Sequence, residues 1–124
     1  MSTDTRAAFP QNEGLESLDY AAIVLATISG LIHFYEGYED LGEGILPILF
    51  ILAGVGFFMW IGLLLVNVPK KPIYIAGFVF TAIQFVMYFV LNWPQIYEAI
   101  GVIDKAVQLV LMIVLVVLYR RNSR

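Results

Sequence analysis

The stretch AAIVLATISGLIHFYEG, residues 21–37, decides the fold. It is apolar over most of its length and, with its flanks, reaches the roughly 20 residues that a helix needs to cross a bilayer. Ala22, Ala26 and Gly30 recur at every fourth position and share one helical face. Small side chains at this spacing let a second helix approach closely. The only histidine of the chain, His33, lies on the neighbouring row, so we expect it to face protein rather than lipid.

Four apolar stretches have membrane-spanning length, at residues 20–38, 45–66, 72–91 and 99–119. Of the 124 residues, 60% are hydrophobic and only 14% are charged, against about 25% charged in soluble domains. A chain this short cannot bury so much apolar surface in water. The stretches also lack the alternation of membrane strands. We therefore predict an all-α, four-helix transmembrane bundle with up-down topology, as one domain over residues 19–119.

The second apolar stretch contains no polar side chain after Pro47, which indicates a scaffold role. Its glycines, Gly54 and Gly62, recur at a helical spacing like the small residues of the first stretch. The predicted helix-packing residues are Ala22, Ala26, Gly30, Gly54 and Gly62.

Basic residues set the orientation of membrane helices, because loops rich in Lys and Arg stay in the cytoplasm. With the helix ends given above, only Lys105 falls toward one side, and the opposite side carries Arg6, Lys70, Lys71, Arg120, Arg121 and Arg124. We therefore predict a multi-pass protein of the cell membrane with both termini cytoplasmic. Residues 1–18 would form a polar N-terminal tail and residues 120–124 a basic C-terminus.

The predicted outer face is acidic, since the connection after the first helix carries Glu39, Asp40 and Glu43. Two interpretations stay open. The acidity is either a chance result among few charges or a surface suited to high salt.

Polar side chains interrupt three of the four helices at a similar depth. The fixed rise of about 1.5 Å per residue places them all in the outer half of an up-down bundle. The predicted cluster consists of His33, Glu36, Gln84, Tyr88, Asp104 and Gln108. We expect Lys105 to pair with Glu36 or with an acidic loop residue.

This cluster has a structural and a functional interpretation. Polar groups in lipid need partners, and hydrogen bonds between helices then only hold the bundle together, at about 0.6 kcal/mol each. Yet a charged side chain deep in the membrane costs about 2.5–3.5 kcal/mol even on the lenient insertion scale. This cost favours the functional interpretation. A histidine near a carboxylate is suited to carrying a proton.

Other chemistries find little support. The chain has no cysteine, which excludes disulfides, thiolate metal sites and thiol catalysis. Zinc sites usually need several His, Cys or carboxylate ligands, so one histidine gives little support for a zinc site. A haem held by two histidines would need His33 from two chains. The chain has no phosphate-binding glycine loop and no dinucleotide fingerprint, and no basic face for nucleic acid. We expect no catalytic residue, no metal and no cofactor.

Three segments, SGLIHFYEG, AGFVFTAIQFVMYFVLNWP and GVIDKAVQLVLMIVLVVLYRR, resemble a family of small four-helix membrane proteins of haloarchaea without assigned function. The resemblance covers about half of the chain. It implies an acidic, high-salt protein and supplies no activity and no site residues.

The leading prediction is a non-enzymatic structural or accessory membrane subunit. Its partners would be the lipid bilayer and either a larger membrane complex or further copies of itself. One alternative is a homo-oligomeric carrier or proton-linked permease that uses His33 and Asp104. The other is a redox protein that binds quinone or haem.

Overall fold

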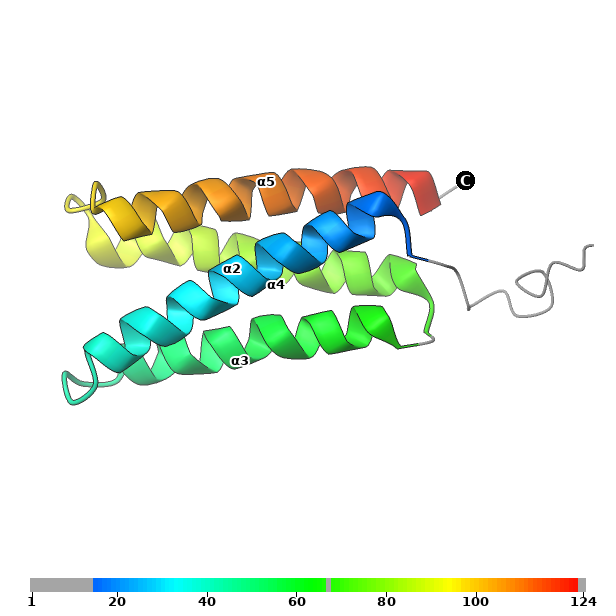
Figure 1. The fold of residues 1–124 in the computed structure, drawn as a ribbon. Helices are drawn as coiled ribbons and strands as arrows, with labels where there is room; N and C mark the ends of the chain where they lie inside the picture. The colour runs from blue at the N-terminus through cyan, green and yellow to red at the C-terminus, as the bar shows by residue number, and fades with distance from the viewer. Residues whose placement is uncertain (1–14, 67, 123–124) are drawn as a thin grey trace, which may run out of the picture.

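The computed structural model describes residues 15–66 and 68–122, which form four α-helices. They are α2 (Ser17–Glu39), α3 (Leu46–Leu65), α4 (Lys70–Asn92) and α5 (Ala99–Asn122), as labelled in Figure 1. Each helix is long and apolar enough to cross a membrane. The prediction of an all-α chain with four helices of membrane-spanning length is therefore confirmed.

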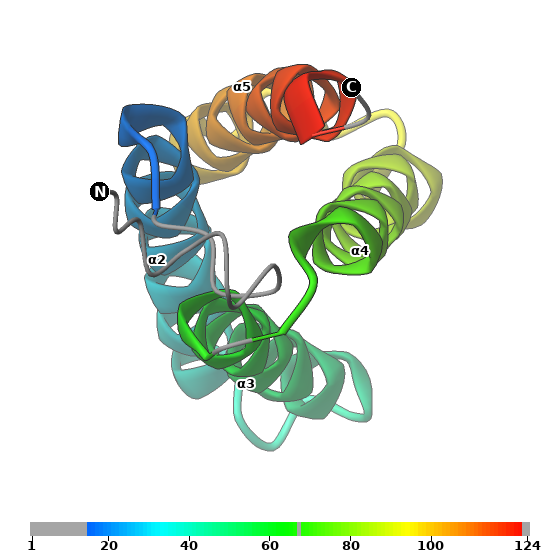
Figure 2. The same cartoon turned by 90° about the vertical axis from the view of Figure 1, so that its right-hand side faces the viewer.

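The helices lie side by side, and their connections gather at two ends (Figure 1). One end, called here the terminal end, holds the start of α2, the end of α5 and the connection from α3 to α4. The other, called the distal end, holds residues 40–45 and 93–98, which join α2 to α3 and α4 to α5. Viewed from the terminal end, the helices surround a common centre in the order α2, α3, α4, α5 (Figure 2).

The first helix begins before the expected residue 20, because Glu16 and Asp19 organise its first turn. The Asp19 carboxylate accepts a hydrogen bond from the backbone N–H of Glu16 at 2.8 Å, as in a capping box. Glu16 also forms an ion pair with Arg121 of α5, with 2.8 Å between the charged atoms.

These contacts hold the start of α2 against the end of α5. Residues 17–18 and 120–122, which the sequence assigns to polar tails, therefore belong to helices. The remainder of the expected tails, including Arg6 and Arg124, lies mostly outside the described residues.

Small residues set the contact between α2 and α3. A Cβ added to Gly30 would lie 2.8 Å from the Phe58 ring. One added to Gly54 would lie 2.8 Å from the Phe34 ring and 3.0 Å from the carbonyl oxygen of Gly30. Nothing larger than glycine fits at these two positions without a shift. Ala22 and Ala26 are fully buried on the same helix as Gly30.

The prediction that Gly62 is a helix-packing residue is wrong within the described chain. Gly62 is exposed, and a Cβ added there would meet open space. Eight residues on an α-helix amount to about 80° beyond two full turns, so Gly62 points away from the face that Gly54 presents to α2. Gly62 contributes no packing contact within the described chain.

The polarity of the bundle is reversed relative to a water-soluble protein. Large apolar side chains are exposed on every helix, and examples are Leu31, Leu52, Met59, Val90 and Ile113. The buried polar and charged side chains are Asp19, Ser29, His33, Lys70, Thr81, Asp104, Lys105 and Gln108. The interior is thus unusually polar for a chain of this composition.

The two halves of the interior differ. Toward the terminal end, an apolar core is packed from Phe57, Trp60, Leu64, Tyr74, Leu111, Leu115 and Leu118. The Trp60 indole N–H there donates to the carbonyl of Ile73 at 2.8 Å and joins α3 to α4. Toward the distal end, polar side chains replace this core and surround a cavity.

Candidate functional site

A cavity of about 340 Å³ lies between the helices in the distal half. All four helices line it. Its polar lining consists of His33, Glu36, Gln84, Tyr88, Asn92, Asp104 and Lys105, and its apolar lining includes Leu49, Phe50, Leu52, Ala53, Phe80 and Met87. A volume of this size is at the lower end of the range typical of small-molecule sites, about 300–1,000 Å³.

Asp104 of α5 is the centre of the polar contacts and is 2% exposed. Its Oδ1 accepts a hydrogen bond from the Ser29 hydroxyl at 2.7 Å. Its Oδ2 lies 3.4 Å from Lys105 Nζ and 3.9 Å from His33 Nδ1. Gln108 donates to the Ser29 hydroxyl oxygen at 3.1 Å. One carboxylate therefore connects a hydroxyl, an ammonium group and an imidazole, from α2 and α5.

His33 is oriented by its own helix. Its Nδ1 lies 2.8 Å from the carbonyl oxygen of Ser29, one turn earlier. Because a carbonyl only accepts, Nδ1 carries the proton and donates it. The ring packs against Phe50 and Phe57, at 5.9 and 5.4 Å between ring centroids. His33 lines the cavity, and no described residue donates a hydrogen bond to its other ring nitrogen, Nε2.

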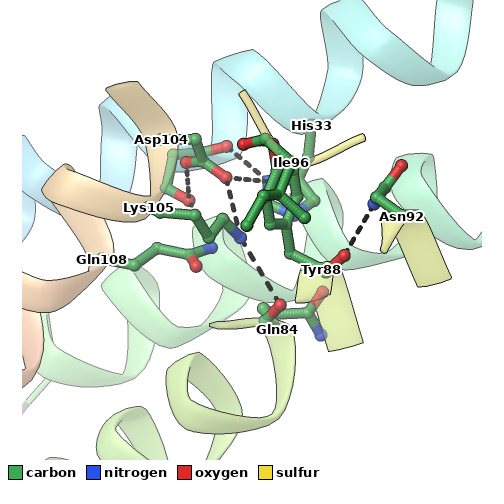
Figure 3. A network of polar contacts seen from close by, with 9 residues as sticks. His33, Gln84, Tyr88, Asn92, Ile96, Asp104, Lys105 and Gln108 are labelled. Carbon is green, nitrogen blue, oxygen red and sulfur yellow. Dashed lines mark hydrogen bonds and ion pairs between the residues drawn. The ribbon is translucent and has the colours of Figure 1, made fainter. Parts of the chain in front are cut away.

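The sequence predicted that Lys105 pairs with Glu36 or an acidic loop residue, and this prediction is wrong, because Lys105 pairs with Asp104. Its ammonium group also lies 3.4 Å from the backbone carbonyl oxygen of Gln84 and 4.9 Å from the centroid of the Tyr88 ring. Figure 3 shows the side chain reaching from α5 toward α4. Lys105 pairs with the adjacent Asp104 carboxylate because its side chain is buried, at 8% exposure, and points inward rather than toward the loops.

The six predicted cluster residues have different positions. His33, Glu36, Gln84, Tyr88 and Asp104 all line the cavity. Gln108 does not line it and reaches Asp104 only through Ser29. The Tyr88 hydroxyl donates to the carbonyl of Ile96, at 2.8 Å, rather than to another member. Glu36 forms no side-chain hydrogen bond or ion pair within the described chain.

Sequence reasoning missed the role of Ser29. The hydroxyl is fully buried and bridges Asp104 to Gln108. The available signal was a hydroxyl one turn before the only histidine. It also missed the contact at the terminal end where the Tyr74 hydroxyl donates to Asp19 Oδ1 at 2.6 Å.

Gln108 presents a further unusual group. Its side-chain oxygen, Oε1, is buried and has no hydrogen-bond partner within the described residues. Among these residues there is also no group of three or more histidine, cysteine or acidic side chains that could hold a metal ion. The site thus combines one imidazole, one ammonium group and two carboxylates with the polar side chains of Gln84, Tyr88 and Asn92 and with apolar walls.

A model of one protein family matches residues 4–119. The chain belongs to the family DUF7475. This family is described as one of unknown function, so the expected membership of a family without assigned function is confirmed. No curated protein and no solved structure matches the chain significantly. Membership of DUF7475 supplies no activity, and the haloarchaeal origin stays a prediction.

Proposed function

We propose that this DUF7475 protein is an integral membrane protein whose four helices cross the cell membrane in up-down order. The observation that carries the proposal is the reversed polarity of the bundle. Exposed faces of all four helices are apolar, and charged side chains such as Asp104 and Lys105 are buried. In water this arrangement would expose a large apolar surface. In a bilayer the apolar faces contact lipid, and the charged side chains are kept away from lipid inside the bundle.

The proposed orientation has the terminal end in the cytoplasm. That end carries the described basic residues Lys70, Lys71, Arg120 and Arg121, and the distal connections carry only acidic charges. Loops rich in Lys and Arg stay in the cytoplasm. Both termini would then be cytoplasmic and the acidic connections would face outward.

The absence of cysteine from the chain makes a clean test possible. Single variants Lys71→Cys and Arg120→Cys report on the terminal end, and Glu43→Cys and Gln95→Cys report on the distal end. A membrane-impermeant maleimide added to intact cells should label only the distal pair, and both pairs after lysis. Labelling of the terminal pair in intact cells would contradict the orientation, and equal labelling of both pairs would contradict four crossings.

As to its role, we propose a non-enzymatic accessory subunit that meets its partner within the membrane. The connections between described helices are short, and no described segment forms a domain outside the bundle. The test is native mass spectrometry after gentle extraction at native expression level. One copy bound to other subunits supports the role.

The cavity favours a second candidate, a homo-oligomeric carrier. Its polar lining would hold a solute or a proton within an assembly of several copies. Four helices alone rarely enclose a path, so this candidate requires self-association. A homo-oligomer in the mass spectrum, together with solute uptake into liposomes that His33→Ala abolishes, would replace the accessory role with this one.

A further inference from the structure

The cavity has two chemically different sides. α2 and α5 supply its imidazole, its carboxylates and its ammonium group, α3 supplies only apolar side chains, and α4 supplies apolar and uncharged polar ones. Leu52 and Met87 belong to that lining and are 58% and 41% exposed, so the apolar side continues onto the outer surface of α3 and α4. A ligand that fills the cavity must therefore be polar at one end and apolar at the other.

The charges of the lining do not balance. Glu36 and Asp104 are acidic and Lys105 is basic, and in its neutral form His33 carries its proton on Nδ1. Asp104 is compensated by Lys105 at 3.4 Å, but Glu36 has no basic partner among the described residues. Glu36 is half-buried, so part of its carboxyl group is removed from water without a basic partner, which is unfavourable for its charge. An anionic ligand would add to the imbalance, and a cationic one would remove it.

Two groups of α2 in the lining are open hydrogen-bond acceptors. Glu36 offers a carboxylate, and His33 offers Nε2, because Nδ1 already donates to Ser29. Both residues lie on α2 three positions apart, where side chains are neighbours about 5–6 Å apart between Cβ atoms. One ammonium group with several N–H donors can contact both. The Phe50 and Phe80 rings in the lining suit a cation with aromatic or aliphatic substituents.

We propose that the cavity binds an amphipathic organic amine in its protonated form. The ammonium group lies between Glu36 and His33, and the apolar part lies along α3 and α4. A metal ion would leave most of the volume and the apolar walls unused. The inference rests on the proposed membrane placement, since lipid is what makes the exposed apolar mouth between α3 and α4 accessible to such a molecule.

The test compares two probes of nearly equal shape, 2-(1-naphthyl)ethylamine and 2-(1-naphthyl)ethanol. The full chain is reconstituted in lipid nanodiscs and titrated by calorimetry, with empty nanodiscs subtracted. The amine should bind saturably with one site per chain and at least tenfold more tightly than the alcohol.

Variants assign the binding to Glu36. Glu36→Gln should weaken binding of the amine at least tenfold and leave the alcohol unchanged, and Glu36→Asp should retain most of the affinity. Glu39→Gln removes the same charge from the exposed end of the same helix, outside the cavity, and should change the affinity less than twofold. Elution volume and melting temperature check that each variant folds.

Three outcomes would overturn the inference. They are equal affinity for amine and alcohol, no saturable binding of the amine, and equal losses in Glu36→Gln and Glu39→Gln, which would indicate only a general acidic field. None of them alters the cysteine-labelling pattern. A failed ligand test is therefore distinguishable from a failed membrane placement.

Discussion

At the scale of single residues, the stability of the interior depends on the opposite charges of Asp104 and Lys105. The two side chains are 2% and 8% exposed and lie 3.4 Å apart. A buried ion pair is a weak source of stability as a whole, but loss of one partner leaves an uncompensated charge.

Asp104→Asn should therefore lower the free energy of unfolding by about 3–5 kcal/mol. The double variant Asp104→Asn with Lys105→Met removes both charges and should regain part of this loss. Chemical denaturation in detergent micelles measures both. A double variant no more stable than Asp104→Asn would contradict the pairing.

Ser29 bridges two helices through one hydroxyl. Ser29→Ala removes its hydrogen bonds to Asp104 and Gln108 and should destabilise the bundle by about 0.6–1.7 kcal/mol, the range of hydrogen bonds between membrane helices. Thr27→Ala is the matched control, because the Thr27 hydroxyl donates only to the carbonyl of Ile23 in its own helix, at 2.7 Å. Equal losses in the two variants, measured in the same micelles, would show that the bridge adds nothing.

At the scale of helices, the crossing of α2 and α3 depends on the absence of side chains at Gly30 and Gly54. A Cβ on Gly54 would press on a backbone carbonyl oxygen, which cannot rotate away. Gly54→Ala should destabilise the bundle by about 1–3 kcal/mol, as for other overpacked sites.

Gly62→Ala is the control on the same helix. The position is open and exposed, and alanine is the better helix former by about 0.8–1.0 kcal/mol. We expect unchanged or slightly raised stability in the same denaturation experiment. Similar losses at Gly54 and Gly62 would contradict this account of the crossing.

Helix periodicity could predict the elements but not their detailed contacts. Length and hydropathy were sufficient to find all four helices, since each apolar stretch allows only one kind of element. Spacing also identified His33, Tyr88 and Asp104 as inward candidates. It could not separate Gly54 from Gly62, because that depends on where α2 crosses α3. It could not choose Asp104 over Glu36 for Lys105 either, because that choice depends on how α5 is rotated relative to α2.

At the scale of the whole molecule, the ends of the bundle differ in charge. The terminal end carries the ion pair between Glu16 and Arg121, which fastens α2 to α5. The distal end carries exposed acidic residues such as Glu39 and Glu43. With the cavity also in the distal half, the proposed orientation directs the open charged group of the site, Glu36, toward the outer face.

This asymmetry predicts how the preference for one orientation can be removed. The variant Glu39→Lys, Glu43→Lys, Glu98→Lys, Lys71→Gln, Arg120→Gln leaves four basic residues on each side of the proposed membrane. Because the bias of Lys and Arg sets orientation, we expect a mixture of both orientations instead of one. Lys70 is kept, since it is buried and donates to the carbonyl of Val66 at 3.1 Å.

Labelling of Gln95→Cys in this background measures the mixture. In intact cells the label should fall from nearly complete to about half, because half of the molecules then hold this position inside the cell, and lysis should restore it. Unchanged labelling would mean that the helices themselves, and not the charges at their ends, decide which way the cavity faces.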